Sequence, residues 1–193
     1  MSLQNDLSLF LQAIKFSADK HRDQRRKDVP ASPYINHPIE VADVLWTIGG
    51  VYDIVTIVGA LLHDTIEDTD TSHEEIRVNF GEEVLTLVLE VSDDRRLPKA
   101  ERKLKQIKTA PLLSARAKQL KLADKTCNIS DIVNRPPHAW SWQRRLEYLE
   151  WAASVAASLR GINVKLEMYF DEVLAAAHKK IAAEKNNQGY PDD

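Results

Sequence analysis

Apolar residues recur every three or four positions along almost the whole chain, and no stretch alternates apolar and polar residues for long enough to predict a strand. The periodic stretches are separated by residues that stop helices. These are Pro30, Pro33, Gly49, Gly50, Gly81, Pro111, Pro136 and Pro137. The pattern predicts an all-α protein, a bundle of about eight to ten helices. A length of 193 residues without a linker-like segment favours one domain, which we expect over residues 1–185, with a flexible polar tail over 186–193.

Two of the predicted helices define where the core should lie. The first begins near the capping residue Asp6 and has an apolar stripe. The stripe consists of Leu7, Phe10, Leu11, Ile14 and Ala18. The third helix begins at Asp53, and residues 54–62 have no polar face. A helix without a polar face has to be buried on all sides, so we expect this one at the centre of the bundle.

A polar cluster follows directly on this central apolar run, where burial would be costly. It contains His63, Asp64, Glu67 and Asp68. Buried charges are normally paired, bound to a metal or functional, because an unpaired one is strongly destabilising. If the helix continues, His63 and Glu67 lie one turn apart, as do Asp64 and Asp68, so one pair could bind a metal while the other transfers protons. An acidic cap on the surface remains the alternative.

The charge and cysteine content of the chain argue against several classes of function. With 26 basic and 29 acidic residues, the net charge of −3 lacks the positive field that drives non-specific nucleic-acid binding. A single cysteine, Cys127, excludes an internal disulfide framework and a thiolate zinc cluster, so a metal would need His and carboxylate ligands. No leader-like segment opens the chain, and no apolar run approaches the ~20 residues that span a bilayer. We therefore expect a cytoplasmic protein with no membrane or nucleic-acid partner.

Three strings carry a family resemblance. His37 lies in YINHP, His63 and Asp64 lie in LLHDTIEDTD, and Asp124 lies in KLADKTCN. In this order the residues resemble the metal-binding signature of the HD-domain phosphohydrolase superfamily, and the longer strings are similar to the hydrolase domain of RelA/SpoT alarmone enzymes. SDD, LPKAERK and EYLEWA extend the likeness to small stand-alone alarmone hydrolases of the metazoan SpoT homologue type. The resemblance covers about residues 7–184 and implies an HD-domain helical bundle.

The resemblance also implies a single divalent metal, usually manganese, with four protein ligands. These are His37, His63, Asp64 and Asp124. Mixed nitrogen and oxygen ligation without thiolate suits Mn²⁺ and does not exclude Zn²⁺ or Fe²⁺. The family's Glu-Asp pair, here Glu67 and Asp68, orients the attacking water and carries its proton, and either residue could be the general base.

The resemblance also implies that basic residues on separate segments of the chain bind the nucleotide. Arg26 and Lys27 match the Arg-Lys pair that lies across the nucleotide in the family. Lys99 follows Pro98 in the first turn of a predicted helix, where the helix dipole opposes a cation, and this placement indicates anion binding. The family resemblance also has a phosphate-contacting lysine there.

Three further residues complete the implied substrate side. Arg144 and Tyr148 match residues that reach the distal phosphates in the small hydrolases. Asn128 shares a polar helix face with Asp124 and resembles an asparagine that the family holds near the ribose or base. Thr126 and Cys127 depart from the bulkier residues common beside it. His21 lies outside any ligand pattern, which is typical of a surface or helix-end residue.

The implied activity is that of a guanosine-3′,5′-bis(diphosphate) 3′-pyrophosphohydrolase of the stringent response. Metal-activated water would remove the 3′-pyrophosphate of ppGpp or pppGpp and leave GDP or GTP. We expect degradation only, because the sequence leaves no room for a synthetase domain. Two alternatives remain open: an HD phosphatase for another phosphorylated nucleotide such as NADPH, and a nucleotide-binding scaffold with an inactive centre.

Overall fold

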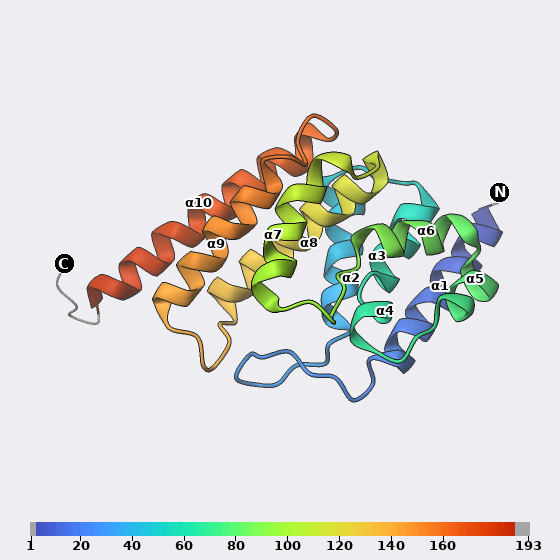
Figure 1. Ribbon diagram of the computed structural model, residues 1–193, viewed down its shortest axis with the longest axis horizontal. Helices are drawn as coiled ribbons and strands as arrows, with labels where there is room; N and C mark the ends of the chain where they lie inside the picture. The colour runs from blue at the N-terminus through green and yellow to red at the C-terminus, as the bar shows by residue number, and fades with distance from the viewer. Residues whose placement is uncertain (1–2, 188–193) are drawn as a thin grey trace.

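The architecture is built from helices alone in the part of the chain that the computed structural model describes, residues 3–187 (Figure 1). This confirms the predicted all-α class and helix number. The ten α-helices are α1 (Leu3–Lys20), α2 (Asn36–Asp43), α3 (Ile54–Leu62), α4 (Thr65–Asp68), α5 (His73–Phe80), α6 (Glu82–Val91), α7 (Lys99–Thr109), α8 (Ala115–Asn134), α9 (Trp142–Ala156) and α10 (Val164–Asn187). One turn of π-helix, Val44–Ile48, extends α2, and one 3₁₀ turn, Ala110–Leu112, follows α7.

Helix α3 lies at the centre, as its uniform apolarity predicts. Every residue from Val55 to Leu62 is buried, and α1, α2, α6 and α8 all pack against it. The Asp53 carboxylate caps its first turn by accepting a hydrogen bond of 3.1 Å from the Thr56 backbone N–H. No helix in residues 3–187 has an apolar stretch long enough to cross a membrane.

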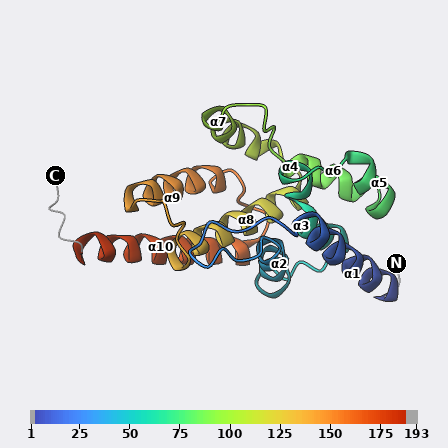
Figure 2. The same ribbon diagram turned by 90° about the horizontal axis from the view of Figure 1, so that it is seen from below.

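Helix α8 is the second structural axis. It starts at Ser114, whose Oγ accepts from the Ala117 backbone N–H at 3.2 Å, and it runs beside α10 and α9 (Figure 2). Four of its charged residues are buried. They are Lys121, Asp124, Lys125 and Asp131. Charges buried at the middle of a core helix mark the place where chemistry is expected.

Helix α7 is less buried than α3 and α8. It contains no fully buried residue, and Figure 2 shows it standing away from α8 and α10. It begins at Lys99, directly after Pro98, as the sequence predicts. Its half-buried residues include Arg102 and Gln106, so the side that faces the protein is largely polar.

The sequence placed the face of α1 and the end of the chain less well. Leu7 and Leu11, expected in the core, are more than half exposed, because Ala13 and Ser17 are the residues that α1 buries. The face of α1 that packs against the core includes Phe10, Ala13 and Ser17, and Leu7 and Leu11 lie outside it. Residues 186 and 187, expected in the tail, belong to α10, and the rest of that tail, residues 188–193, lies outside the described residues.

Candidate active site

The chain bends at the end of α3, where the polar cluster begins. His63 ends α3, Asp64 follows in a turn, and the short helix α4 starts anew at Thr65. The Thr65 hydroxyl stabilises this break by donating a hydrogen bond of 2.7 Å to the Leu62 carbonyl. The expectation of one continuing helix is therefore wrong. The break lets His63 and Asp64 face α2 and α8, whereas Glu67 faces the 92–98 loop.

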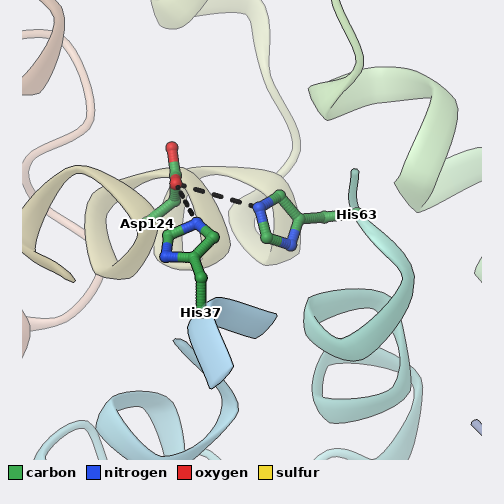
Figure 3. Close-up of side chains that lie close together, drawn as sticks. All are labelled: His37, His63 and Asp124. Carbon is green, nitrogen blue, oxygen red and sulfur yellow. Dashed lines mark hydrogen bonds and ion pairs between the residues drawn. The ribbon is translucent and has the colours of Figure 1, made fainter. Parts of the chain in front are cut away.

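Four side chains from three segments converge at this bend. His37 comes from α2 and Asp124 from α8, and Figure 3 shows their side chains pointing toward each other and toward His63. His37 Nε2 lies 3.1 Å from Asp124 Oδ1 and 3.8 Å from Asp64 Oδ2. His63 Nε2 lies 3.0 Å from Asp64 Oδ2 and 3.8 Å from Asp124 Oδ1. Both histidines are almost completely buried.

The donor set fits a divalent cation. His63 Nδ1 donates to the Ala60 carbonyl at 2.8 Å, which leaves Nε2 facing the carboxylates as the atom that could bind a metal. Beyond the carboxylates of Asp64 and Asp124, that buried Nε2 has no polar partner among the described residues. One ligand atom each from His37, His63 and Asp124 lie within 4.8 Å of one another. Imidazole nitrogens and carboxylate oxygens at this spacing match the ligands of manganese, iron or zinc.

The electrostatics of the cluster favour positive charge at its centre. Burial alone would raise the pKa of Asp124, but the Lys125 ammonium and the His37 ring outweigh it and hold that pKa well below its ordinary value. Burial also acts to lower the pKa of His63, yet the neighbouring carboxylates of Asp64 and Asp124 raise it to about 9. The carboxylates are therefore ionised and attract a cation.

The two remaining carboxylates of the cluster are held by other elements. Glu67 Oε2 accepts from the Asp93 backbone N–H at 2.9 Å, and Oε1 lies 3.5 Å from the Arg102 guanidinium of α7. Burial raises the pKa of Glu67 to about 7, against the opposing effect of the Asp93 N–H. Asp68 accepts from the Gln24 side chain at 2.9 Å and forms an ion pair with Arg95. Both carboxylates line a cavity that also contains the imidazole and carboxylate cluster.

This cavity adjoins a second, larger one. The smaller, of about 200 Å³, contains the imidazole and carboxylate cluster, and the larger, of about 310 Å³, extends toward α9. Their shared walls are Tyr34, His37, Asp68, Arg95 and Asn128. Four predicted substrate residues line the larger cavity. They are Arg26, Lys27, Asn128 and Tyr148. A ligand that fills both cavities would reach from the cluster to these residues.

The other two predicted substrate residues, Lys99 and Arg144, do not line either cavity. They nevertheless lie near it, because Arg144 stacks 4.3 Å from the ring of Trp140, which does line the larger cavity. Partial burial and the nearby cations Arg144, Lys27 and Arg102 lower the pKa of Lys99. Cations from three distant segments therefore converge, which is the arrangement expected for binding a polyanion.

Sequence reasoning missed several residues of the site. Tyr34 donates a hydrogen bond of 2.5 Å to Asp64 Oδ2, and Lys125 Nζ lies 2.8 Å from Asp124 Oδ2. Both stand inside the strings that carry the family resemblance, so the signal for them was present. Arg102 was also missed, although it lies in the string LPKAERK, whereas no periodicity or motif distinguishes Gln24 and Arg95.

Comparison with known proteins agrees with this geometry. The family described as HD domain matches residues 13–148. A relative from Xenopus tropicalis, named guanosine-3′,5′-bis(diphosphate) 3′-pyrophosphohydrolase MESH1, is 47% identical over 178 residues, which cover 90% of this chain and 99% of the relative. The human protein of the same name is 50% identical over 163 residues, or 84% of this chain and 91% of the relative.

Solved structures give the same result. One described as "A metazoan ortholog of SpoT hydrolyzes ppGpp and plays a role in starvation responses" superposes with a TM-score of 0.85 at 43% identity, over 87% of this chain and 94% of the other. A Listeria monocytogenes protein, lmo0812, reaches a TM-score of 0.60 at 28% identity, over 75% of this chain and 97% of the other. The chain belongs to the HD-domain family and, within it, to the small SpoT-like branch that includes the MESH1 proteins.

Proposed function

We propose that this protein hydrolyses the 3′-pyrophosphate of ppGpp and pppGpp, releasing pyrophosphate and leaving GDP or GTP. The observation that carries the proposal is the junction of the two cavities. A cluster suited to a metal lies at one end, and cations from three chain segments surround the other. The names of the relatives from Xenopus tropicalis and human support the same substrate. We assign the activity to a single hydrolase domain over residues 1–185.

A divalent metal, most suitably Mn²⁺, would be held by four side chains. These are His37, His63, Asp64 and Asp124. When bound there, it would acidify a water molecule and offset the charge that develops on a phosphoryl oxygen. Tyr34 and Asn128 would orient the two carboxylate ligands, since they donate hydrogen bonds to Asp64 and Asp124 respectively.

Glu67 and Asp68 would orient the attacking water and accept its proton. Both line the smaller cavity beside the cluster, and neither is among the four ligands. A base is most effective when its pKa lies near the working pH, and burial brings Glu67 to about 7. The Asp93 N–H and Arg102 hold its carboxylate at two points, so its orientation is set before the substrate arrives.

The substrate would lie across both cavities with its 3′-pyrophosphate at the cluster. The Arg26 guanidinium already lies over the Tyr34 ring, at 5.6 Å, and it can stack on a base in the same manner. Lys27, Lys99 and Arg144 would bind the 5′-phosphates. Tyr148 and Asn128 would contribute a hydroxyl and an amide at the wall that they line. We propose the cytoplasm as the location, since the buried free thiol of Cys127 suits a reducing compartment.

A substrate panel tests the proposal. Purified protein with Mn²⁺ is incubated with ppGpp, NADPH and a cyclic nucleotide, and the products are separated by ion-exchange chromatography. We expect GDP and pyrophosphate from ppGpp, and no turnover by a His63→Ala variant assayed in parallel. Release of phosphate from NADPH without any pyrophosphate from ppGpp would replace the proposal with the other phosphatase activity. Absence of turnover on every substrate would favour the inactive scaffold.

A further inference from the structure

His21, expected at the surface, is buried behind the candidate catalytic carboxylates. Only 2% of it is exposed, and its Nδ1 lies 2.7 Å from the side-chain oxygen of Gln24. The buried Nε2 has no hydrogen-bond partner among the described residues. Burial lowers the pKa of His21, so the ring is neutral. A neutral histidine that makes one directed contact with a glutamine suggests a role other than filling space.

The contact continues from Gln24 to Asp68. Gln24 Nε2 donates a hydrogen bond of 2.9 Å to Asp68 Oδ2. An ionised carboxylate can only accept, so the glutamine must present its NH₂ group to Asp68 and its oxygen to His21. His21 must then carry its proton on Nδ1 and donate it to that oxygen. The three side chains therefore form a directed relay, His21 to Gln24 to Asp68.

A second arm of the same unit reaches Asp64. The Tyr34 backbone N–H donates to the Gln24 carbonyl at 3.1 Å, and the Tyr34 ring lies 4.9 Å from the His21 ring. The Tyr34 hydroxyl donates to Asp64 at 2.5 Å. The segment that follows α1 therefore donates hydrogen bonds to two carboxylates of the site, from Gln24 to Asp68 and from Tyr34 to Asp64.

Of the two groups that hold the Asp68 carboxylate, the His21–Gln24 pair is the less exposed to solvent. The other partner of this carboxylate, Arg95, is about half exposed, with a side-chain exposure of 55%, whereas Gln24 is half-buried and His21 behind it is buried. Arg95 binds Oδ1 and Gln24 binds Oδ2, so the two donors hold the carboxylate from opposite oxygens. Without Gln24, Asp68 could turn toward Arg95 and away from the cavity.

We propose that His21 and Gln24 are positioning residues for hydrolysis: together they fix the Asp68 carboxylate in the orientation that the reaction uses. This inference rests on the proposed function, in which Asp68 contacts the attacking water. Gln24 is the residue type that the relay requires, because one amide both accepts from His21 and donates to Asp68. No hydrogen bond or ion pair joins either side chain to the four metal-ligand candidates in residues 3–187.

Two substitutions of Gln24 test the relay. Gln24→Met keeps the size of the side chain and removes both hydrogen bonds, and the loss of one bond to a charged group should lower kcat about tenfold. Metal content should not change, and KM should change less than kcat, although Gln24 also lines the larger cavity. Gln24→Glu should lower kcat further, because it turns a carboxylate toward Asp68. Gln12→Met is the matched control, since Gln12 is exposed on α1 and its side chain hydrogen-bonds only to Asn79 among the described residues. Equal kcat values for Gln24→Met and Gln12→Met would overturn the proposal.

The histidine is tested by a conservative and a disruptive change. Asparagine can place a donor near the position of Nδ1, so His21→Asn should retain most of the activity, whereas His21→Leu should lose it. In the double variant His21→Leu/Gln24→Met, kcat should fall no further than in Gln24→Met alone, because His21 acts through Gln24. A purely structural role predicts additive losses that follow thermal stability. If His21→Leu does not fold, the two Gln24 variants decide the matter.

Nitrogen NMR of His21 provides a readout that is independent of hydrolysis. The relay predicts the Nδ1–H form in the wild-type protein and its loss in Gln24→Met. A wild-type ring protonated on Nε2 would overturn the relay even in an active enzyme. If the wild-type protein releases no pyrophosphate from ppGpp, the proposed function fails, and the NMR result still decides whether the relay exists.

Discussion

The two sides of the active site are built very differently. On the cluster side, the candidate ligands stand on or beside α2, α3 and α8, which pack against one another, and His37, His63 and Asp124 are buried. On the cation side, Lys99 lies on α7, which buries no residue completely, and Arg144 lies exposed on α9. The candidate metal ligands are fixed by the core, whereas the cations proposed to bind phosphates stand on the surface.

This difference follows from what each side must do. Metal ligands and proton-transfer groups must be held close to their working geometry before the substrate arrives, because reorganisation during the reaction is costly. Cations that bind flexible phosphates can adjust their long side chains. We therefore expect substitutions on the cluster side to abolish chemistry, and those on the cation side to weaken binding.

The largest expected effect comes from removing a ligand. His63→Ala and Asp124→Asn should lose metal and hydrolysis together, because few protein ligands hold the cation. Asparagine is preferred at 124, since alanine would leave the buried Lys125 ammonium without its partner. Elemental analysis after dialysis measures the metal, with the exposed His73→Ala as the control. Full metal content in both variants would contradict the ligand assignment.

A smaller but still severe effect should follow from neutralising the proton-transfer groups. Glu67→Gln and Asp68→Asn should retain metal and lose about 10²-fold or more in kcat, as expected when a general base is removed. Asp70→Asn is a suitable control, because Asp70 is exposed and outside both cavities. Near-normal kcat in both variants would show that Glu67 and Asp68 do not transfer protons and form only an acidic cap.

The pH dependence sharpens the same prediction. Glu67 must be unprotonated to accept a proton, and burial raises its pKa to about 7. The kcat of the wild-type protein should therefore fall as the pH is lowered through this value. In Glu67→Gln the remaining activity should lose that inflection. An unchanged inflection in the variant would assign it to another group.

The sequence predicted the cluster side better than the cation side, for physical reasons. Residues 54–62 have no polar face, which predicts a buried helix, and charges that follow such a helix are normally paired or functional. The start of the central helix at Asp53 is a local signal that the structure confirms, whereas Asp6, expected to cap the first helix, lies inside α1. The convergence of Lys99 with Arg144 depends on how α7 lies against α9, and no local pattern specifies that packing.

Residues that act through distant partners were not predictable. Gln24 and Asp68 are 44 positions apart, and Arg102 and Glu67 are 35 apart. Neither pair has a helical spacing that would bring its members together. The bend at His63 was missed for a similar reason, because Asp64-Thr65 contains no glycine or proline. The side-chain hydrogen bond from Thr65 that stabilises the break becomes visible only in three dimensions.

On the cation side the expected effect is on binding. Lys99→Ala and Arg144→Ala should each raise KM for ppGpp about tenfold, as the loss of one charge-assisted contact predicts, and leave metal content unchanged. Lys108→Ala serves as the control, since it removes an exposed lysine from the same helix. A fall in kcat without a change in KM would mean that these cations act on the chemistry, and the contrast between the two sides would fail.

The smallest expected effect compares identical substitutions at the starts of two helices. Ser114 caps α8, which carries Asp124, and Ser141 caps α9, which carries Arg144 and Tyr148. Each serine accepts one backbone N–H at 3.2 Å, and the Ser114 hydroxyl also donates to Glu90 at 2.7 Å, so Ser→Ala should cost about 1 kcal/mol of unfolding free energy at Ser141 and somewhat more at Ser114.

The consequences for activity should nevertheless differ between these two variants. Helix α8 is held by α10, α9, α2, α6 and α3, so Ser114→Ala should leave both kinetic constants unchanged. Loosening the first turn of α9 displaces Arg144 directly, because the Arg144 backbone N–H is the donor to Ser141. Ser141→Ala should therefore raise KM by about twofold at constant kcat, a fraction of the effect of losing the whole contact. Urea unfolding measures the free energy of unfolding, and steady-state kinetics measure KM and kcat. An equal change of KM in both variants would show that packing in the core does not keep α8 in place when its cap is lost.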